Sequence, residues 1–281
     1  MNFSVIWTIL ACTSLTAPVE TIEQSGNALC NGADLCAEPF NTATMLGTHN
    51  SAASTAYNFI AGVNANQSTT ISKQLEDGIR LLMLDIYEED GEHLLCHGPC
   101  LLGSISHQLV LEEIGTFLNE NPREVLSIVY QNDISSDEIA QDLDKADMSK
   151  WLFTYDGVWP TLGEMITADK RLVVTVEVDG GTPPSIPNTW NLAWDTDYAW
   201  ADVDAFNCEL YRGTLSNEVV LVNHWISTGF GTPAIESADE ANAANSILGH
   251  ADQCPRSPTW VAVDFYEYGD PFQAVTVLNG L

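Results

Sequence analysis

Strand-length apolar runs alternate with helix-like segments along this chain of 281 residues, and this alternation restricts its fold more than any other feature. The apolar runs cover residues 44–47, 79–87, 94–96, 125–131, 172–178, 219–223 and 260–265. Helix signals lie at 72–76, 107–119, 136–146, 161–168 and 238–251. Most runs are continuously apolar, which favours strands covered on both faces, as in a parallel sheet wrapped by helices. We therefore predict a (β/α) barrel with nearer seven clear strands than eight, the doubtful one lying in 189–201.

The predicted barrel is a single domain with one irregular connection. A chain of this length with 45% hydrophobic residues can form one α/β barrel, and no internal linker, repeat or low-complexity segment divides it. The acidic turn at 88–92 is too short to hold a crossover helix between two parallel strands. We expect a local departure from the barrel pattern at this turn.

Polar residues close most of the apolar runs. In (β/α) barrels, catalytic side chains gather at the mouth where the strands end. The residues at these positions are His49, Asp85, His97, Gln131, Glu177, Asp179, His224 and Asp264. Because the set is rich in groups that exchange protons, it predicts a general acid–base site. Asp179 and His224 are assigned to substrate binding, although His224 could equally cap a strand.

Asp85 lies inside the apolar run 79–87. Its alternation partners Leu81 and Met83 are expected to face the barrel interior, where an unpaired carboxylate is costly, so Asp85 needs a partner there. Arg80 points to the other face of the same run. We interpret Arg80 as a structural ion-pair partner rather than as a phosphate ligand.

The chain is strongly acidic. Nine Lys and Arg residues stand against 39 Asp and Glu residues, which gives a formal net charge of −30. This balance argues against nucleic acid and against an anionic membrane surface as partners. An anionic substrate must therefore be met by local cations, which are a metal ion, a protonated histidine or a few of the basic side chains.

The first 17 residues have the pattern of a signal peptide, a short apolar segment followed by small residues. Pro18 follows directly and no basic residue precedes the apolar segment, so the cleavage site is left open. We expect a secreted, extracellular protein with an N-terminal segment at 18–29 and the barrel at 30–281. No later run is long and apolar enough to span a bilayer, and no amphipathic basic segment predicts stable membrane attachment.

Six cysteines remain after the predicted signal peptide, which itself contains Cys12. In a secreted chain an even number predicts disulfides, and the close pairs Cys30/Cys36 and Cys96/Cys100 would leave Cys208/Cys254, although six cysteines permit 15 connectivities. A zinc site is the weaker interpretation because the chain has no Cys-x-x-Cys pair. Separately, Asn66 begins a glycosylation sequon, which predicts a glycan in an exposed polar loop.

Several ordered motifs resemble one known family. They are the segments CNGADLC at 30–36, GTHNS at 47–51, QLEDGIR at 74–80, CH at 96–97, NPREV at 121–125, WPTLGE at 159–164 and VDFY at 263–266. With these motifs the chain resembles the phosphatidylinositol-specific phospholipase C (PI-PLC) X-domain superfamily over about residues 30–281, and most closely the secreted phospholipase C-like phosphodiesterases of fungi. The resemblance implies a single irregular (β/α)8 TIM barrel of the phospholipase C-like phosphodiesterase type.

The resemblance also implies the acid–base roles. His49 is then the general base that removes a proton from an attacking hydroxyl group, and His97 is the general acid that protonates the leaving oxygen. Asp264 matches the aspartate that, in bacterial relatives, orients the base and stabilises its charged form, as the third member of a triad does.

The resemblance supports metal dependence at some positions and not at others. Asp85 matches an acidic residue of calcium-dependent eukaryotic members, where metal-free bacterial members carry an arginine, and Asn50 matches a calcium ligand. Two acidic ligands of those members are replaced here, by Met83 and Gln131, while Glu177 could restore a carboxylate. Together Asn50, Asp85, Gln131 and Glu177 would form a hard oxygen site for Ca²⁺ or Mg²⁺.

The leading interpretation is a secreted, monomeric phosphoric diester hydrolase or lyase that cleaves by internal attack of a hydroxyl group and releases a cyclic phosphate. Inositol phospholipids and phosphoglycans have such a hydroxyl; direct attack by water would extend the range to glycerophosphodiesters. Two alternatives stay open. One is a barrel enzyme that acts on a polysaccharide, and the other is a non-catalytic barrel that binds lipid or glycan.

Overall fold

The computed structural model describes Met1, residues 29–229 and residues 231–281. The predicted signal peptide (1–17) and N-terminal segment (18–29) therefore lie outside the described residues, apart from their end positions. The strands are β1 (Met45–Thr48), β2 (Leu81–Glu89), β3 (Glu92–Cys96), β4 (Ser104–Ser106), β5 (Leu126–Asn132), β6 (Leu172–Val176), β7 (Ala193–Asp195), β8 (Val219–Asn223) and β9 (Trp260–Val263). The α-helices are α1 (Ile71–Asp77), α2 (His107–Glu120), α3 (Ser136–Lys145), α4 (Leu162–Thr167), α5 (Ala238–Ala241), α6 (Ala244–Ala251) and α7 (Pro271–Leu278).

Seven strands form a parallel series in the order β6-β5-β2-β1-β9-β8-β7. The last strand, β9, pairs with the first, β1, as it does when a chain winds around a barrel. Within the described part of the chain, no strand pairing joins β6 to β7. The mixed α/β sheet and its seven parallel strands confirm the coarse prediction, with β7 in the doubtful region 189–201, but a closed eight-stranded barrel is not confirmed.

The irregular connection predicted at 88–92 is confirmed. β2 turns directly into β3, which pairs with it antiparallel, and β4 extends the hairpin. Asp90 and Gly91 form the tight turn with φ angles of 53° and 82°, a left-handed conformation that glycine adopts without strain. This hairpin runs back along β2 and brings His97, the residue after β3, near Asp85, where the parallel part of β2 ends.

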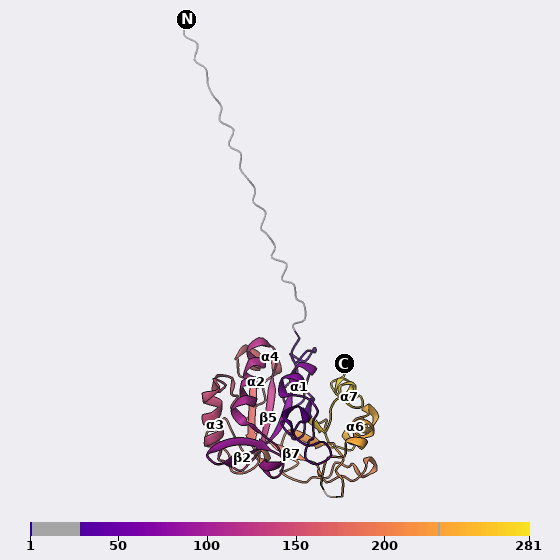
Figure 1. Cartoon of the computed structure of the whole chain (residues 1–281). Coiled ribbons are helices and arrows are strands. Elements are labelled where there is room, and N and C mark those ends of the chain that lie inside the picture. The colour runs from indigo at the N-terminus through magenta and orange to yellow at the C-terminus, as the bar shows by residue number, and fades with distance from the viewer. Residues whose placement is uncertain (2–28, 230) are drawn as a thin grey trace.

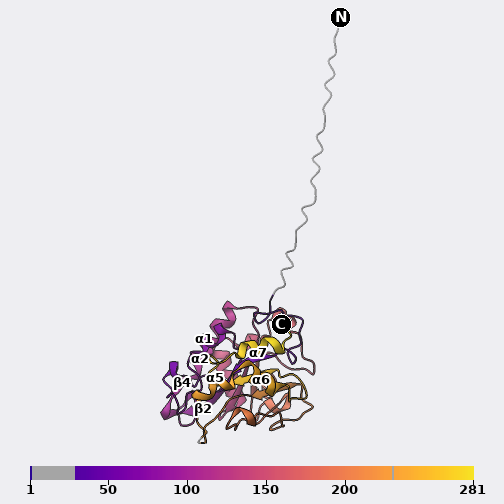
Figure 2. The ribbon, with the colours of Figure 1, turned by 90° about the vertical axis from the view of Figure 1, so that its right-hand side faces the viewer.

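Both faces of the parallel strands are buried, which explains their continuous apolar sequences. On β2, Leu82 and Leu84 pack in the cluster with α1 and α2, whereas Leu81 and Met83 pack in a second cluster on the opposite face. Figure 1 shows α2, α3 and α4 on one side of the strands and α6 and α7 on the other, and Figure 2 looks onto α5, α6 and α7. The helices thus cover one face of the strands, and the opposite face packs mainly against side chains from the other strands, as in the interior of a barrel.

Local signals set the bounds of the helices. Ser135 caps α3 in a capping box with Glu138, and Thr161 caps α4 in the same way with Glu164. At the other end of α1, Gly78 takes the left-handed conformation that ends a helix. No helix among the described residues has both the length and the apolar character needed to cross a membrane.

Covalent and ionic contacts confirm two further predictions. The disulfides join Cys30 to Cys36, Cys96 to Cys100 and Cys208 to Cys254. The guanidinium of Arg80 donates to the Glu124 carboxylate at 2.7 Å and to two backbone carbonyls, so Arg80 has the structural role predicted for it.

Candidate active site

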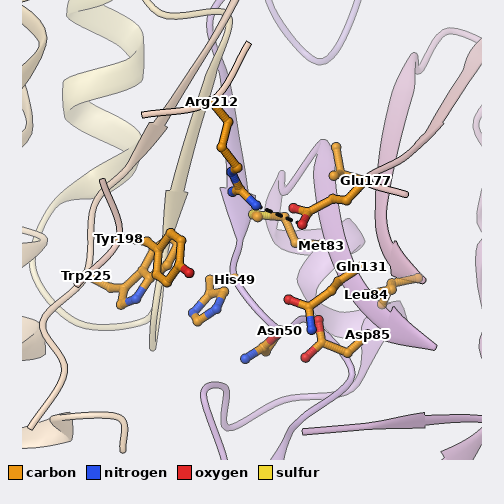
Figure 3. Close-up of a pocket in the computed structure, with 11 residues that line it drawn as sticks. His49, Asn50, Met83, Leu84, Asp85, Gln131, Glu177, Tyr198, Arg212 and Trp225 are labelled. Carbon is orange, nitrogen blue, oxygen red and sulfur yellow. Dashed lines mark hydrogen bonds and ion pairs between the residues drawn. The ribbon is translucent and has the colours of Figure 1, made fainter. Parts of the chain in front are cut away.

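The ends of the parallel strands enclose two adjoining pockets. Both are lined by His49, Asn50, Asp85, Gln131, Tyr198 and Trp225. Glu177 and Arg212 line the first pocket, and His97 lines the second. Five of the residues predicted from strand ends therefore meet at one site, and Figure 3 shows His49, Asp85 and Gln131 facing the same space.

Two contacts hold the ring of His49, a hydrogen bond at its edge and a stacked ring on one face. Its Nδ1 atom lies 2.8 Å from Oδ1 of Asp264, and its ring stacks on Trp225 with centroids 3.7 Å apart and an interplanar angle of 7°. The Asn66 amide donates to both Asp264 oxygens, at 3.0 and 2.9 Å. Because a carboxylate only accepts hydrogen bonds, Nδ1 carries the proton and Nε2 is left to exchange one.

His97 lies across the pocket, with its ring centroid 6.4 Å from that of His49. Its Nδ1 atom lies 3.0 Å from the Asn64 carbonyl oxygen, so this nitrogen carries the proton and Nε2 exchanges one. Burial lowers the pKa of His97, because desolvation disfavours the charged ring. A protonated His97 is consequently a stronger acid than an exposed histidine.

Asp85 lies beside Gln131, its register partner on β5, and opposite Asn50. Burial raises the pKa of Asp85 to about 7. With its amide in one orientation, Asn50 donates to Asn66 and turns its oxygen toward the Asp85 carboxyl group, and either a bound cation or a proton on Asp85 would remove the repulsion between these oxygens. In the reverse orientation, the Asn50 nitrogen lies 3.0 and 3.2 Å from the two carboxylate oxygens. The oxygen donors of Asn50, Asp85 and Gln131 thus fit a hard cation in the first orientation.

Glu177 is engaged by a guanidinium that sequence reasoning missed. Arg212 donates to Glu177 at 2.8 Å and to the buried Asp195 at 2.6 Å, and it lies over the Trp190 ring at 4.0 Å. This ion pair occupies the carboxylate that the predicted metal site would use. Arg212 lies in the connection between β7 and β8, where no sequence motif marked it, and its partners are 17 and 35 positions away.

The prediction that His224 contacts substrate is wrong. The side chain is 0% exposed; its Nε2 lies 2.7 Å from the Ala241 carbonyl oxygen and its Nδ1 lies 2.9 Å from Nδ1 of His250. Burial lowers the pKa of His224 to about 3 and that of His250 to about 4. His224 follows β8 as expected, but its ring points into the protein and packs on Phe206.

Two other assignments need correction. Asp179 is exposed in the bend after β6, and it does not line either pocket, so the structure does not bring it to the site. Asn66 is only 1% exposed, and its amide nitrogen binds Asp264 instead of facing solvent. A glycan attaches at that nitrogen, so the folded structure leaves no room for glycosylation at Asn66.

A mixed α/β sheet of parallel strands, with a His–Asp pair facing a second histidine at the strand ends, is typical of a protein of the TIM-barrel type with a candidate active site at this edge. The family model described as PI-PLC X 1 matches residues 35–279, and the chain therefore belongs to the PI-PLC X-domain family.

Three similar proteins extend this comparison. The PI-PLC X domain-containing protein 1 of Arthroderma benhamiae is 30% identical, over 95% of this chain and 94% of its own. An uncharacterized secreted protein of the same fungus is 26% identical over 90% of this chain, which spans only 64% of that relative's length. The phosphatidylinositol-specific phospholipase C of Listeria monocytogenes has a similar fold, with a TM-score of 0.58 at 15% identity over 88% of this chain and 95% of its own.

Proposed function

We propose that this chain is a secreted phosphodiesterase that cleaves a phosphodiester by histidine general base and general acid catalysis. The observation that carries the proposal is the pairing of His49 with Asp264 at 2.8 Å, opposite a second histidine whose Nδ1 atom is also fixed. A base and an acid on opposite sides of one pocket suit the transfer of a phosphoryl group from one oxygen to another.

His49 and His97 exchange one proton each in this mechanism. Nε2 of His49 takes the proton of a substrate hydroxyl, whose oxygen forms a new bond to phosphorus. The bond from phosphorus to the leaving oxygen breaks, and Nε2 of His97 supplies the proton that this oxygen needs. When the hydroxyl belongs to the substrate itself, the products are a cyclic phosphate and an alcohol. Asp264 stabilises the imidazolium that forms on His49.

The pocket needs a cation besides Arg212 to hold an anionic phosphate. Arg212 is the only Lys or Arg among the described residues that line the two pockets, and its charge is already balanced by Glu177 and Asp195. Asn50, Asp85 and Gln131 would hold Ca²⁺ or Mg²⁺. A bound divalent ion would neutralise charge on the phosphate oxygens.

The substrate class we propose is a phosphodiester with a hydroxyl next to the ester, as in inositol phospholipids and phosphoglycans. The Listeria neighbour is named for phosphatidylinositol, which supports the first of these. Glycerophosphodiesters would follow if water attacked directly. Three disulfides and a fungal relative named as secreted support an extracellular location.

Product release from a panel of lipid and soluble phosphodiesters tests the proposal, with and without a chelator. We expect His49→Ala and His97→Ala each to lose at least about 100-fold in rate, and the exposed control Asp252→Ala to keep the wild-type rate. Phosphorus NMR of early product should show a cyclic phosphate. Turnover of a glycan without phosphate, or turnover that survives His49→Ala, would contradict the proposal.

A further inference from the structure

A second cluster of chemically active side chains lies outside the pocket. His93 on β3, His107 at the start of α2 and Asp142 on α3 place their ligand atoms within 4.8 Å of one another. Nδ1 of His93 lies 2.5 Å, and Nδ1 of His107 3.0 Å, from the same oxygen, Oδ2 of Asp142. Three elements that are separate in sequence thus direct two imidazole nitrogens and one carboxylate oxygen to a single point.

This cluster is separated from the active site by the sheet. His107 contacts the hydroxyl of Tyr130 at 2.8 Å, and Tyr130 packs in the hydrophobic cluster between strands and helices. The next residue on β5, Gln131, lines the pocket, and successive residues of a strand point to opposite faces. The cluster therefore belongs to the helix-covered face of the sheet, and the proposed catalytic residues do not use it.

We propose that His93, His107 and Asp142 form a binding site for a divalent transition-metal ion of the zinc class. Two imidazoles and one carboxylate are a ligand set that such ions take, in contrast to the all-oxygen donors of Asn50, Asp85 and Gln131. The side chains of His107 and Asp142 are 0% and 8% exposed, whereas that of His93 is 20% exposed, which gives an ion access from solvent and leaves room for a water ligand.

The surroundings of the cluster orient its ligand atoms. The Nε2 contact of His107 with Tyr130 fixes the ring, as the outer partner of a metal-ligating histidine does. The Lys145 ammonium donates to Oδ1 of Asp142 at 2.9 Å and leaves Oδ2 turned toward the histidines. On binding, an ion would displace the two Nδ1 protons, so each ring would carry its proton on Nε2 and the affinity would rise with pH.

Calorimetric titration of the chelator-treated full-length protein with Zn²⁺ tests the site through His93→Asn. The amide nitrogen of asparagine can replace the Nδ1 donor of His93 and keep a hydrogen bond to Asp142, but it removes the imidazole ligand. We expect the wild type to bind Zn²⁺ at this cluster, and His93→Asn to weaken that binding at least about 100-fold. His97→Ala should keep it. Any zinc binding that His97→Ala removes belongs to the active site instead.

A variant of the exposed Lys145 gives a second test, because we expect it to increase zinc affinity and misfolding could only decrease it. Lys145→Met removes a positive charge beside the site, so zinc affinity should rise by about 3–10-fold. Lys150→Met is the matched control, because Lys150 forms the same i,i+3 pair with Asp147 away from the cluster. The proposal would be overturned if the wild type bound no Zn²⁺ at this cluster, or if neither His93→Asn nor Lys145→Met changed the zinc affinity. The cluster would then be a structural hydrogen-bond network only.

Discussion

The Nδ1 atom of His49 lies 2.8 Å from Oδ1 of Asp264, although the two residues are 215 positions apart in the chain. The contact follows from the pairing of β1 with β9, in which Thr48 is the register partner of Val263. The residues that follow these two positions leave the sheet side by side at the same edge. The pairing of the first strand with the last therefore builds the candidate catalytic dyad.

Asp264→Asn should lower kcat by about 10²–10⁴-fold. The amide nitrogen of asparagine can donate to Nδ1 of His49, which places the ring proton on Nε2, and Nε2 can then no longer accept a proton from the substrate. The measurement is steady-state kinetics on whichever phosphodiester the wild type cleaves, with KM expected to change little. Glu267→Gln, the same chemical change at an exposed position three residues later, is the control. Equal activity of Asp264→Asn and the wild type would remove Asp264 from the mechanism.

Asn66 should carry no glycan in folded protein secreted from a eukaryotic host. Its amide nitrogen donates to both oxygens of Asp264, and a sugar on that nitrogen would break both hydrogen bonds inside the site. Peptide mass spectrometry of active protein, with and without glycosidase, measures the occupancy directly. Active protein with a glycosylated Asn66 peptide would show that the site has a different arrangement.

Asp85→Asn should stabilise the metal-free protein above pH 7. The pKa of Asp85 is raised to about 7 in the fold, whereas the unfolded chain ionises near 3.8, so ionisation favours the unfolded state as pH rises between these values. The full shift is worth about 4 kcal/mol, and we expect about 2 kcal/mol because the side chain partly reaches solvent. Urea unfolding in chelator at pH 5 and pH 8 measures the gain, which should be clearly larger at pH 8 than at pH 5, where only about a third of it is present.

Stabilisation of the protein by added Ca²⁺ should require the Asp85 carboxylate. If the carboxylate holds the ion, Ca²⁺ raises the Tm of the wild type and leaves that of Asp85→Asn unchanged. Asp133→Asn, at an exposed position beyond β5, is the control and should respond as the wild type does. A Ca²⁺-induced rise in Tm that Asp85→Asn retains would place the ion elsewhere.

The buried pair His224 and His250 should make the fold sensitive to acid. Their pKa values are lowered to about 3 and 4, whereas a histidine of the unfolded chain titrates near 6.5. The unfolded state therefore binds more protons between these values, and stability decreases as the pH is lowered through this range. Between pH 7 and pH 5 each histidine should cost about 2 kcal/mol. In urea unfolding, His250→Gln should reduce this loss. An unchanged pH dependence in that variant would show that other groups cause it.

Much of the fold and part of the site could be predicted because their signals are local in sequence. The runs that became β2 and β5, the tight turn at Asp90 and the closely spaced cysteines can each be interpreted within a few residues. The strand-end rule also placed His49 and Asp85 together. It does not say which way a side chain turns after the strand, and His224 turns into the core, where its partners come from α5 and α6.

Long connections produced the remaining errors. The loop that carries Asn66 packs across the mouth of the sheet, and Asn66 meets Asp264 across 198 positions. Arg212 likewise reaches two carboxylates on different strand ends from the connection between β7 and β8. Such contacts depend on how a loop folds over the sheet, and periodicity or spacing carries no signal for that.

Arg212→Met should destabilise the fold by about 3–5 kcal/mol, because it leaves the carboxylates of Asp195 and Glu177 close together and without their guanidinium. Arg212→Lys should destabilise the fold less than Arg212→Met, because an ammonium keeps the positive charge. Some loss should remain, because an ammonium cannot donate to both carboxylates as a guanidinium does. Urea unfolding measures both, with the exposed Arg256→Met as control, expected within about 0.5 kcal/mol of the wild type.

The pH dependence of this loss separates an electrostatic cause from a packing cause. Burial raises the pKa of both Asp195 and Glu177, so without Arg212 these carboxylates are more readily protonated as pH falls. Protonation removes their mutual repulsion, and the difference between wild type and Arg212→Met should therefore be larger at pH 8 than at pH 5. A difference that is the same at both pH values would mean that Arg212 stabilises the pocket mainly by its packing on Trp190, rather than by its charge.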